Sequence, residues 1–222
     1  WKHQFQFAGY YMAIKKGFYR DAGMKVQLKE FSPDSNVANI VLSGEADFGI
    51  MDSDLIRIRS QGAPVVALGV IYQHSPLALV ASSNSGIKEL HQLKDKRVSL
   101  ETHSVDIHAM LKTANLKESD IKASEHHFNP NAILTDQVDA MSVYTTDEIF
   151  LLRQANFNYR LFSPRNYGID LYGDTLFTTE KMIKNHPNLV EKFRAASSKG
   201  WKYAISHADE AVNYILETYG TR

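Results

Sequence analysis

The sequence contains no cysteine, and this absence excludes several kinds of chemistry at once. A chain of 222 residues without cysteine has no disulfide, no thiolate nucleophile and no metal site built on sulfur ligands. It also has no excess of positive charge, because 25 basic residues are balanced by 25 acidic ones. The basic surface expected of a nucleic-acid-binding protein is therefore not indicated.

Long apolar runs are missing as well. No stretch approaches the roughly 20 apolar residues that span a bilayer, and no segment has the pattern of a signal peptide. The chain begins at a tryptophan rather than at an initiator methionine, so we expect an excised domain or a processed product. The 44% hydrophobic and 23% charged content is typical of a globular chain with one large core or two modest ones.

Short strand-like and helix-like segments alternate along the chain. Residues 26–31, 46–51 and 63–72 are strand-like, and helices with capping residues and glycine stops separate them. This βαβαβ order predicts a mainly parallel sheet with helices on its faces. The pattern recurs over residues 76–163, and the last third of the chain is helical. We therefore predict an α/β fold with two lobes.

Two lobes in one chain require structured crossings, because no low-complexity linker divides the sequence. We place the crossings near residues 80–83 and 164–176. Lobe 1 then consists of residues 1–81 together with residues 176–222, and lobe 2 consists of residues 82–175. Such a pair is predicted to be hinged, with a ligand-binding cleft between the lobes.

Aromatic residues are concentrated in the opening segment, where Trp1, Phe5, Phe7, Tyr10 and Tyr11 lead into the first predicted helix. An aromatic loop that feeds a helix N-terminus offers stacking surfaces beside free backbone N–H groups. We interpret this segment as one wall of the cleft. Simple core packing is the better interpretation for one of the two tyrosines.

Polar residues follow four of the predicted strands. In parallel α/β sheets the ligand lies beyond the carboxyl ends of the strands, so we expect these residues to converge on the cleft. Taken singly, Ser53, Ser104 and Thr146 are more simply helix N-caps. The four segments are Asp52-Ser53-Asp54, Gln73-His74-Ser75, Thr102-His103-Ser104 and Tyr144-Thr145-Thr146-Asp147-Glu148.

Acidic residues dominate the predicted rim, where Lys2 and Arg165 are the only cations that we place. The acidic residues at or near the rim are Asp52, Asp54, Glu101, Asp147, Glu148, Asp170 and Asp174. A sulfonate or phosphate would need arginine or lysine aimed inward. The acidic and aromatic character instead predicts a flat, neutral or weakly cationic nitrogen heterocycle that stacks on rings and donates to a carboxylate. The candidate ligand-binding residues are Trp1, Phe7, Tyr10, Ser53, Asp54, Gln73, Ser75, Thr102, Tyr144, Glu148, Asp170, Tyr172 and Asp174.

Several stretches together resemble one family across essentially the whole chain. They are similar to the thiamine-precursor (pyrimidine) binding branch of the type II periplasmic binding proteins, and most like the extracytoplasmic sensor domains of bacterial histidine kinases and diguanylate cyclases. The resemblance implies two α/β lobes that close on a small-molecule ligand. The stretches are WKHQFQFAGYY, GEADFGI, QGAPVVALGVIYQHSP, VDAMSVYTTDE, YGIDLYGDTLFTTE and GWKYAISHADE.

The resemblance implies roles at individual positions. Trp1 matches a tryptophan that follows the family's first strand, and Tyr144 and Glu148 match a stacking ring and a hydrogen-bonding carboxylate. Ser53 and Asp54 are implicated in the same way. Asp147 stands where many relatives have asparagine, which leaves the identity of the ligand open.

We expect no catalytic activity, no cofactor and no metal. Related fungal pyrimidine synthases use a cysteine-rich motif and a histidine, whereas this chain has no cysteine and no histidine in residues 52–56. The predicted function is an extracytoplasmic ligand-sensing input domain, tethered to the inner membrane in the full-length protein as part of a membrane-anchored signalling protein. The alternatives are a free binding protein that works with an ABC permease and a pyrimidine-processing enzyme. A homodimer is left open as an assembly.

Overall fold

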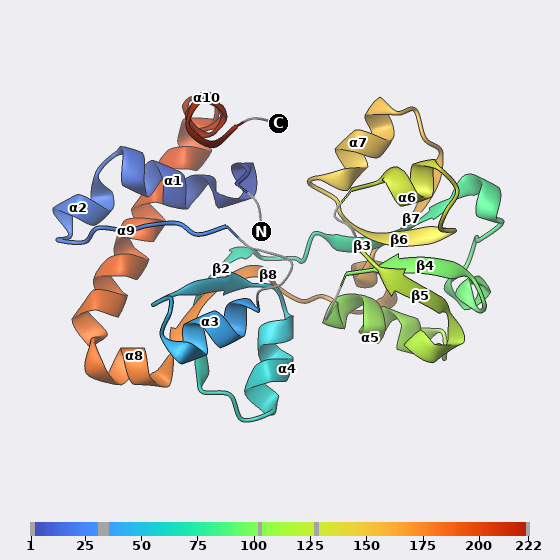
Figure 1. Cartoon of the computed structure of the whole chain (residues 1–222), viewed down its shortest axis with the longest axis horizontal. Coiled ribbons are helices and arrows are strands. Elements are labelled where there is room, and N and C mark those ends of the chain that lie inside the picture. Colours follow the sequence, from blue (N-terminus) through green and yellow to red (C-terminus); the bar gives the residue numbers. More distant parts are fainter. Residues whose placement is uncertain (1–2, 31–35, 102–103, 127–128, 221–222) are drawn as a thin grey trace. The chain divides into compact units, whose positions relative to one another are not determined.

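The computed structural model describes residues 3–30, 36–101, 104–126 and 129–220, which fall into two compact units (Figure 1). Unit 1 consists of Trp1–Gly49, Pro64–Gly69 and Phe177–Arg222, and unit 2 of Ile50–Ala63 and Val70–Leu176. The predicted lobe 1 also included residues 50–63 and 70–81, which pack in unit 2. Packing alone does not show which residues move together as one lobe. The lobe boundaries therefore stay a prediction.

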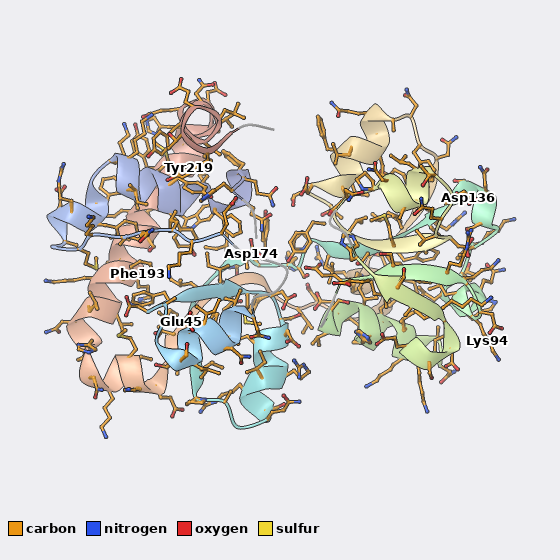
Figure 2. The ribbon with its side chains drawn as sticks, viewed as in Figure 1. Glu45, Lys94, Asp136, Asp174, Phe193 and Tyr219 are labelled. Carbon is orange, nitrogen blue, oxygen red and sulfur yellow. The ribbon has the colours of Figure 1, made fainter. Side chains whose placement is uncertain are left out.

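Unit 1 is mainly helical. Its longest helix, α9, has proline at its first position, where the missing N–H costs nothing. Its Phe193 stacks on Phe48 with ring centroids 3.9 Å apart (Figure 2). The elements of the unit are η1 (Phe5–Phe7), α1 (Ala8–Lys15), α2 (Phe18–Asp21), α3 (Val37–Ser43), α8 (Glu180–Asn185), α9 (Pro187–Ser206) and α10 (Ala208–Tyr219).

Helices α1 and α9 cross at two glycines. A Cβ atom added to Gly200 would lie 2.0 Å from the carbonyl oxygen of Gly9, and one added to Gly9 would lie 2.2 Å from Cγ of Trp201. Only residues without a side chain allow the two backbones to approach this closely. The buried side chains Ala8, Met12, Ala204 and Ala211 complete this small core.

Three strands cross the boundary between the units. They are β1 (Gly49–Met51), β2 (Val65–Tyr72) and β8 (Gly173–Thr179), and they form a sheet in the order β1-β8-β2. The chain changes unit inside each of these strands. Each strand therefore contributes residues to both units.

Unit 2 is built on a five-stranded sheet in the order β5-β4-β6-β3-β7. Strand β4 pairs in parallel with β5 and β6, whereas β3 runs antiparallel to β6 and β7, so the sheet is mixed. The elements of the unit are α4 (Asp54–Ser60), β3 (Leu77–Ser82), η2 (Ser83–Ser85), η3 (Leu90–Leu93), β4 (Arg97–Leu100), α5 (Val105–Thr113), η4 (Glu118–Asp120), β5 (Lys122–Glu125), α6 (Asn131–Leu134), β6 (Ala140–Tyr144), α7 (Glu148–Gln154), β7 (Tyr159–Phe162) and η5 (Pro164–Tyr167).

Both faces of this sheet are covered by helices. Alternate residues of β3 point to opposite faces: Leu77 and Leu79 pack with residues of α5, and Ala78 and Val80 with residues of α6 and α7. Figure 1 shows α5 on one side of the sheet and α6 and α7 on the other. A strand that is buried on both faces has apolar residues at successive positions. This is why the β3 sequence LALVAS does not alternate between apolar and polar residues.

The predicted first strand differs in the structure. In its described part, residues 26–30, the first four residues alternate between half-buried and exposed, but the segment has no strand hydrogen-bonding pattern. Alternation follows from an extended chain with one side against the protein, whereas a strand also needs a neighbouring strand to bond with. The α/β class itself is confirmed by the two sheets and their helices.

Candidate functional site

The candidate site lies in unit 2, where the neighbouring parallel strands β4 and β6 end. Glu101 follows β4, and its backbone N–H donates to Oγ of Ser142 on β6 at 2.8 Å. Ser142 is a buried hydroxyl within an apolar strand. The hydrogen bond fixes Glu101 beside the last residues of β6, which include Tyr144.

Glu148 is held by the backbone at the start of α7. Its side chain is 1% exposed, and Oε2 accepts a hydrogen bond from the Tyr144 N–H at 2.8 Å. A carboxylate at the first turn of a helix also faces the unpaired N–H groups there. The local sequence, a buried strand followed at once by a helix, therefore places the ring of Tyr144 and the carboxyl group of Glu148 together.

A second acidic group comes from the start of α4. Asp52 accepts from the Asp54 N–H at 2.8 Å, and Asp54 is paired with Arg57 through two contacts of 2.5 and 2.8 Å. Ser53 donates its hydroxyl to Oδ1 of Asp106 on α5. Ser53 and Asp106 are both buried.

The carboxyl groups of this site are difficult to ionise. The pKa of Glu101 is raised to about 8, first by burial and then by the negative charges of Asp52, Glu148 and Asp174. Burial also raises the pKa of Asp52 and of Glu148 to about 7 each. At neutral pH the site therefore holds protons that free carboxylates would have lost.

Tyr144 stays protonated among these acids. Burial raises its pKa well above the ordinary value, and the charges of Asp174, Glu101 and Asp52 raise it further. Asp174, on β8 (Figure 2), is buried and has a φ of 40°, which is uncommon for a residue other than glycine. Unusual backbone conformations of this kind are often found at functional sites.

The arrangement suits a ligand that brings N–H donors or positive charge. Ionised carboxylates accept hydrogen bonds from such a ligand, and each opposite charge lowers the cost of ionising its neighbours. Among the described residues, no three histidine, aspartate or glutamate side chains are arranged to hold a metal ion. No helix in the same part of the chain is both long and apolar enough to cross a membrane.

A groove of about 500 Å³ lies beside this group, between α4 and α5. Val105 and Ala109 are its apolar lining residues. Charged and polar side chains line the rest, and they are Asp54, Arg57, His108, Lys112 and Glu118. The groove shares Asp54 with the predicted ligand-binding residues.

The structure brings five of the predicted residues together in unit 2: Ser53, Asp54, Tyr144, Glu148 and Asp174, all of them buried. It also shows what the candidate N-caps do. The side chains of Ser53 and Ser104 make no capping hydrogen bond to their helices. Thr146 lies one position before the N-cap of α7, which is Asp147. The simple capping interpretation is therefore wrong for these hydroxyls.

Other predicted residues lie elsewhere in unit 2. Gln73 is exposed, and its amide reaches only the Val70 carbonyl at 3.5 Å. Tyr172 is 53% exposed. Asp170 is an exposed residue that pairs with His74 at 2.8 Å.

The remaining predicted residues have structural contacts or belong to unit 1. The hydroxyl of Ser75 accepts from a backbone N–H at 3.3 Å. Phe7 is half-buried against the α1 core, and Tyr10 is 2% exposed with its ring edge-on to Trp201. Trp1 and Thr102 lie outside the described residues.

Asp106 and Ser142 were missed by sequence reasoning, and Asp52 and Glu101 were placed on the rim without being chosen as candidates. A serine in the middle of the apolar run VDAMSVY is the one available signal for Ser142, because a buried hydroxyl needs a partner. Asp106 lies in the first turn of α5, where an acidic residue is ordinary. Its role depends on a contact with a residue 53 positions away.

Comparison with known proteins decides the family. The model of the family described as NMT1/THI5 like matches residues 4–211. The chain belongs to the NMT1/THI5-like family. The predicted resemblance is confirmed at this level, and the link to sensor domains stays a prediction.

Relatives in this family carry names of two kinds. The riboflavin-binding protein RibY of Chloroflexus aurantiacus is 27% identical over 96% of this chain and 62% of its own length. A formylaminopyrimidine-binding protein of Halalkalibacterium halodurans is 22% identical, over 93% of this chain and 64% of its own length. A 4-amino-5-hydroxymethyl-2-methylpyrimidine phosphate synthase of Legionella pneumophila is 24% identical, over 93% of this chain and 67% of its own length. The chain thus spans about two thirds of the length of these relatives.

Solved structures confirm the predicted type II periplasmic-binding-protein fold. The alkanesulfonate-binding protein SsuA from Xanthomonas axonopodis pv. citri, bound to MOPS, has a TM-score of 0.74 at 17% identity, over 96% of this chain and 76% of that one. SsuA from Escherichia coli gives 0.73 at 19% identity, over 97% and 72%. Likeness at this identity shows the fold alone.

Proposed function

We propose that the chain is an extracytoplasmic small-molecule-binding domain whose ligand is a planar nitrogen heterocycle with amino or protonated ring-nitrogen donors, such as a thiamine-precursor-like pyrimidine. The observation that carries the proposal is the group of carboxyl groups around Tyr144, of which Glu148 is buried and Asp52 and Glu101 are partly exposed. Asp52, Glu101 and Glu148 have raised pKa values there. A ring that carries positive charge or several N–H donors lowers the free-energy cost of ionising these carboxyl groups, whereas a sulfonate adds another negative charge.

We further propose that the domain is the sensing input of a bacterial signalling protein tethered to the inner membrane. The support is the resemblance of its motifs to sensor domains. The second candidate, a binding protein that delivers its ligand to an ABC permease, is supported by relatives named as binding proteins. The full-length gene product separates the two: a fused kinase or cyclase supports the sensor, and a separate chain encoded beside a permease supports the transporter.

A pyrimidine-processing enzyme is the third candidate function, since some relatives are named as synthases. We propose a non-enzymatic role, because the chain lacks cysteine and has no histidine in residues 52–56. Incubation with candidate pyrimidines followed by product analysis checks this. Any turnover contradicts it.

The binding proposal is tested by a thermal-shift screen at pH 7 with 4-amino-5-hydroxymethyl-2-methylpyrimidine, thiamine, riboflavin and MOPS. A ligand at 100 times its Kd stabilises the folded state by about 2.7 kcal/mol. We expect an aminopyrimidine to raise Tm and MOPS to have no effect. Glu148→Gln should abolish the shift, and Glu217→Gln, at an exposed position of α10, should keep it. A shift by MOPS alone would overturn the ligand class.

A further inference from the structure

Side-chain hydrogen bonds take over from backbone pairing where strands β4 and β6 end. Among the described residues, the last backbone pair between these two strands is Ser99 with Met141. Two positions after Ser99, the Glu101 N–H donates to Oγ of Ser142 on β6 at 2.8 Å. A serine hydroxyl thus accepts the hydrogen bond that a continued parallel ladder would direct to a carbonyl oxygen.

The same serine is also bonded from β5, on the other side of β4 (Figure 1). Nε2 of His126, which follows β5, lies 2.9 Å from the carbonyl oxygen of Ser142. A carbonyl oxygen only accepts, so Nε2 carries the hydrogen of this bond. Because β4 lies between β5 and β6, the His126 side chain reaches past the end of β4 to make the contact.

Glu101 lies where this contact passes the end of β4. Leu100 pairs with Glu125, so Glu101 and His126 are the next residues of the two chains. His126 is 4% exposed and Ser142 is 1% exposed. Buried polar side chains that are hydrogen-bonded in this way favour one fixed arrangement. His126 and Ser142 therefore form a bridge from β5 to β6, and Glu101 lies between them in the register.

The carboxyl group of Glu101 belongs electrostatically to the candidate site. Its pKa is raised to about 8, first by burial and then by the charges of Asp52, Glu148 and Asp174. The charge of Glu101 in turn helps to raise the pKa of Tyr144. A displacement of the Glu101 backbone therefore moves this carboxyl group relative to the other groups of the site, and a loosely held group binds a ligand less well.

We propose that Ser142 and His126 are positioning residues that present the carboxyl group of Glu101 to the ligand. Ser142 holds the Glu101 backbone directly, and His126 holds Ser142. The effect of the bridge on ligand affinity rests on the proposed function, whereas its effect on the Glu101 carboxyl group does not.

Calorimetry at pH 7 with 4-amino-5-hydroxymethyl-2-methylpyrimidine tests the effect on the ligand. Ser142→Ala should weaken binding about fivefold, as for the loss of one ordinary hydrogen bond. In a chain that already carries Glu101→Ala, the same substitution should change Kd by less than about twofold, because the group that Ser142 positions is gone. Equal losses of affinity in the two backgrounds would overturn the proposal.

Ser82→Ala is the matched control for Ser142→Ala. Ser82 ends β3 beside the start of β6, is 5% exposed, and accepts from the Asn84 N–H at 3.3 Å. It therefore loses the same kind of buried hydrogen bond in the same sheet, away from Glu101. Ser82→Ala should leave Kd unchanged. A loss of affinity as large as that of Ser142→Ala would overturn the proposal, because it would follow from weakening the sheet in general.

Two variants of His126 test the other end of the bridge. The side-chain amide of His126→Gln can still donate to the Ser142 carbonyl oxygen, so this variant should bind like the wild type. His126→Phe keeps a ring but has no donor, and it should bind about as weakly as Ser142→Ala. Equal affinities of the two variants would overturn the role of this hydrogen bond.

Carbon NMR of the Glu101 carboxyl group in the ligand-free protein tests the structural part. Ser142→Ala should lower the pKa of Glu101 from about 8 toward its usual value of 4.5, because a displaced carboxyl group gains water and moves away from neighbouring acids. Ser82→Ala should leave the titration unchanged. A Glu101 pKa that does not fall in Ser142→Ala overturns the proposal whether or not a ligand binds. A fall in a chain that binds no pyrimidine supports the positioning role and refutes the proposed ligand.

Discussion

Replacing Glu148 by glutamine should make the protein more stable at alkaline pH while removing its ligand binding. The pKa of Glu148 is raised from 4.5 to about 7 in the folded chain, mainly by burial. Between these two values the folded chain binds more protons than the unfolded chain, so the free energy of unfolding falls as the pH rises. The loss is complete once the pH exceeds the folded pKa.

The size of the effect follows from the same shift. Linkage gives a cost of about 3 kcal/mol at pH 8 and about 1 kcal/mol at pH 5 for ionising Glu148 in the folded chain. Glutamine keeps an oxygen that accepts from the Tyr144 N–H, but its amide hydrogens lack an obvious partner, at a cost of about 1 kcal/mol at every pH. The variant should therefore gain about 2 kcal/mol at pH 8 and almost nothing at pH 5.

The assay is thermal unfolding of wild type and Glu148→Gln at pH 5.0, 6.5 and 8.0. For a chain of this size, 2 kcal/mol corresponds to a rise in Tm of about 4–8 °C. The exposed Glu217→Gln controls for the simple loss of a negative charge. Equal destabilisation of Glu148→Gln at all three pH values would show that its carboxyl group is ionised and well solvated, and would refute the reasoning.

Three further substitutions test other parts of the structure. Gly200→Ala should lower the stability of unit 1 by about 1–3 kcal/mol by overpacking the α1–α9 crossing. Gly69 has open space around it, so Gly69→Ala should have little effect on Tm. Equal effects of the two substitutions on Tm would contradict the close approach of α1 and α9. Ser53→Ala should cost about 1–3 kcal/mol in thermal unfolding by leaving its buried aspartate partner on α5 short of a donor, and Ser60→Ala, whose hydroxyl bonds only its own helix, should be neutral. Tyr144→Phe keeps the ring and should bind the pyrimidine within about tenfold of wild type in calorimetry, as for the loss of one hydrogen bond, whereas Tyr144→Ala should not bind; binding by the alanine variant would remove Tyr144 from the site.

The sequence predicted the parts of the site that depend on neighbours along the chain. Tyr144 and Glu148 are four positions apart, and a buried strand followed by a helix was enough to place them together. The alternation of strands and helices was also predictable, because it too depends on residues that are neighbours along the chain. The extended segment at residues 26–30 was misjudged because its side-chain alternation does not reveal whether a partner strand is present.

Contacts between distant positions could not be predicted. Ser53 bonds a residue 53 positions away, and Glu101 bonds Ser142, 41 positions away. Local patterns assigned Ser53 to helix capping, and its hydroxyl instead donates to Asp106 on a different helix. Raised pKa values at Asp52 and Glu101 likewise depend on burial that no local pattern encodes.

The passage of β1, β2 and β8 from one unit to the other has a practical consequence for dissecting the protein. Unit 2 takes its residues from two separate stretches of chain, and unit 1 from three. No single truncation yields either unit intact, so a deletion series that loses ligand binding would report misfolding rather than the location of the site. Point variants, or circular permutants that rejoin the stretches of one unit, are the informative way to assign function within this chain.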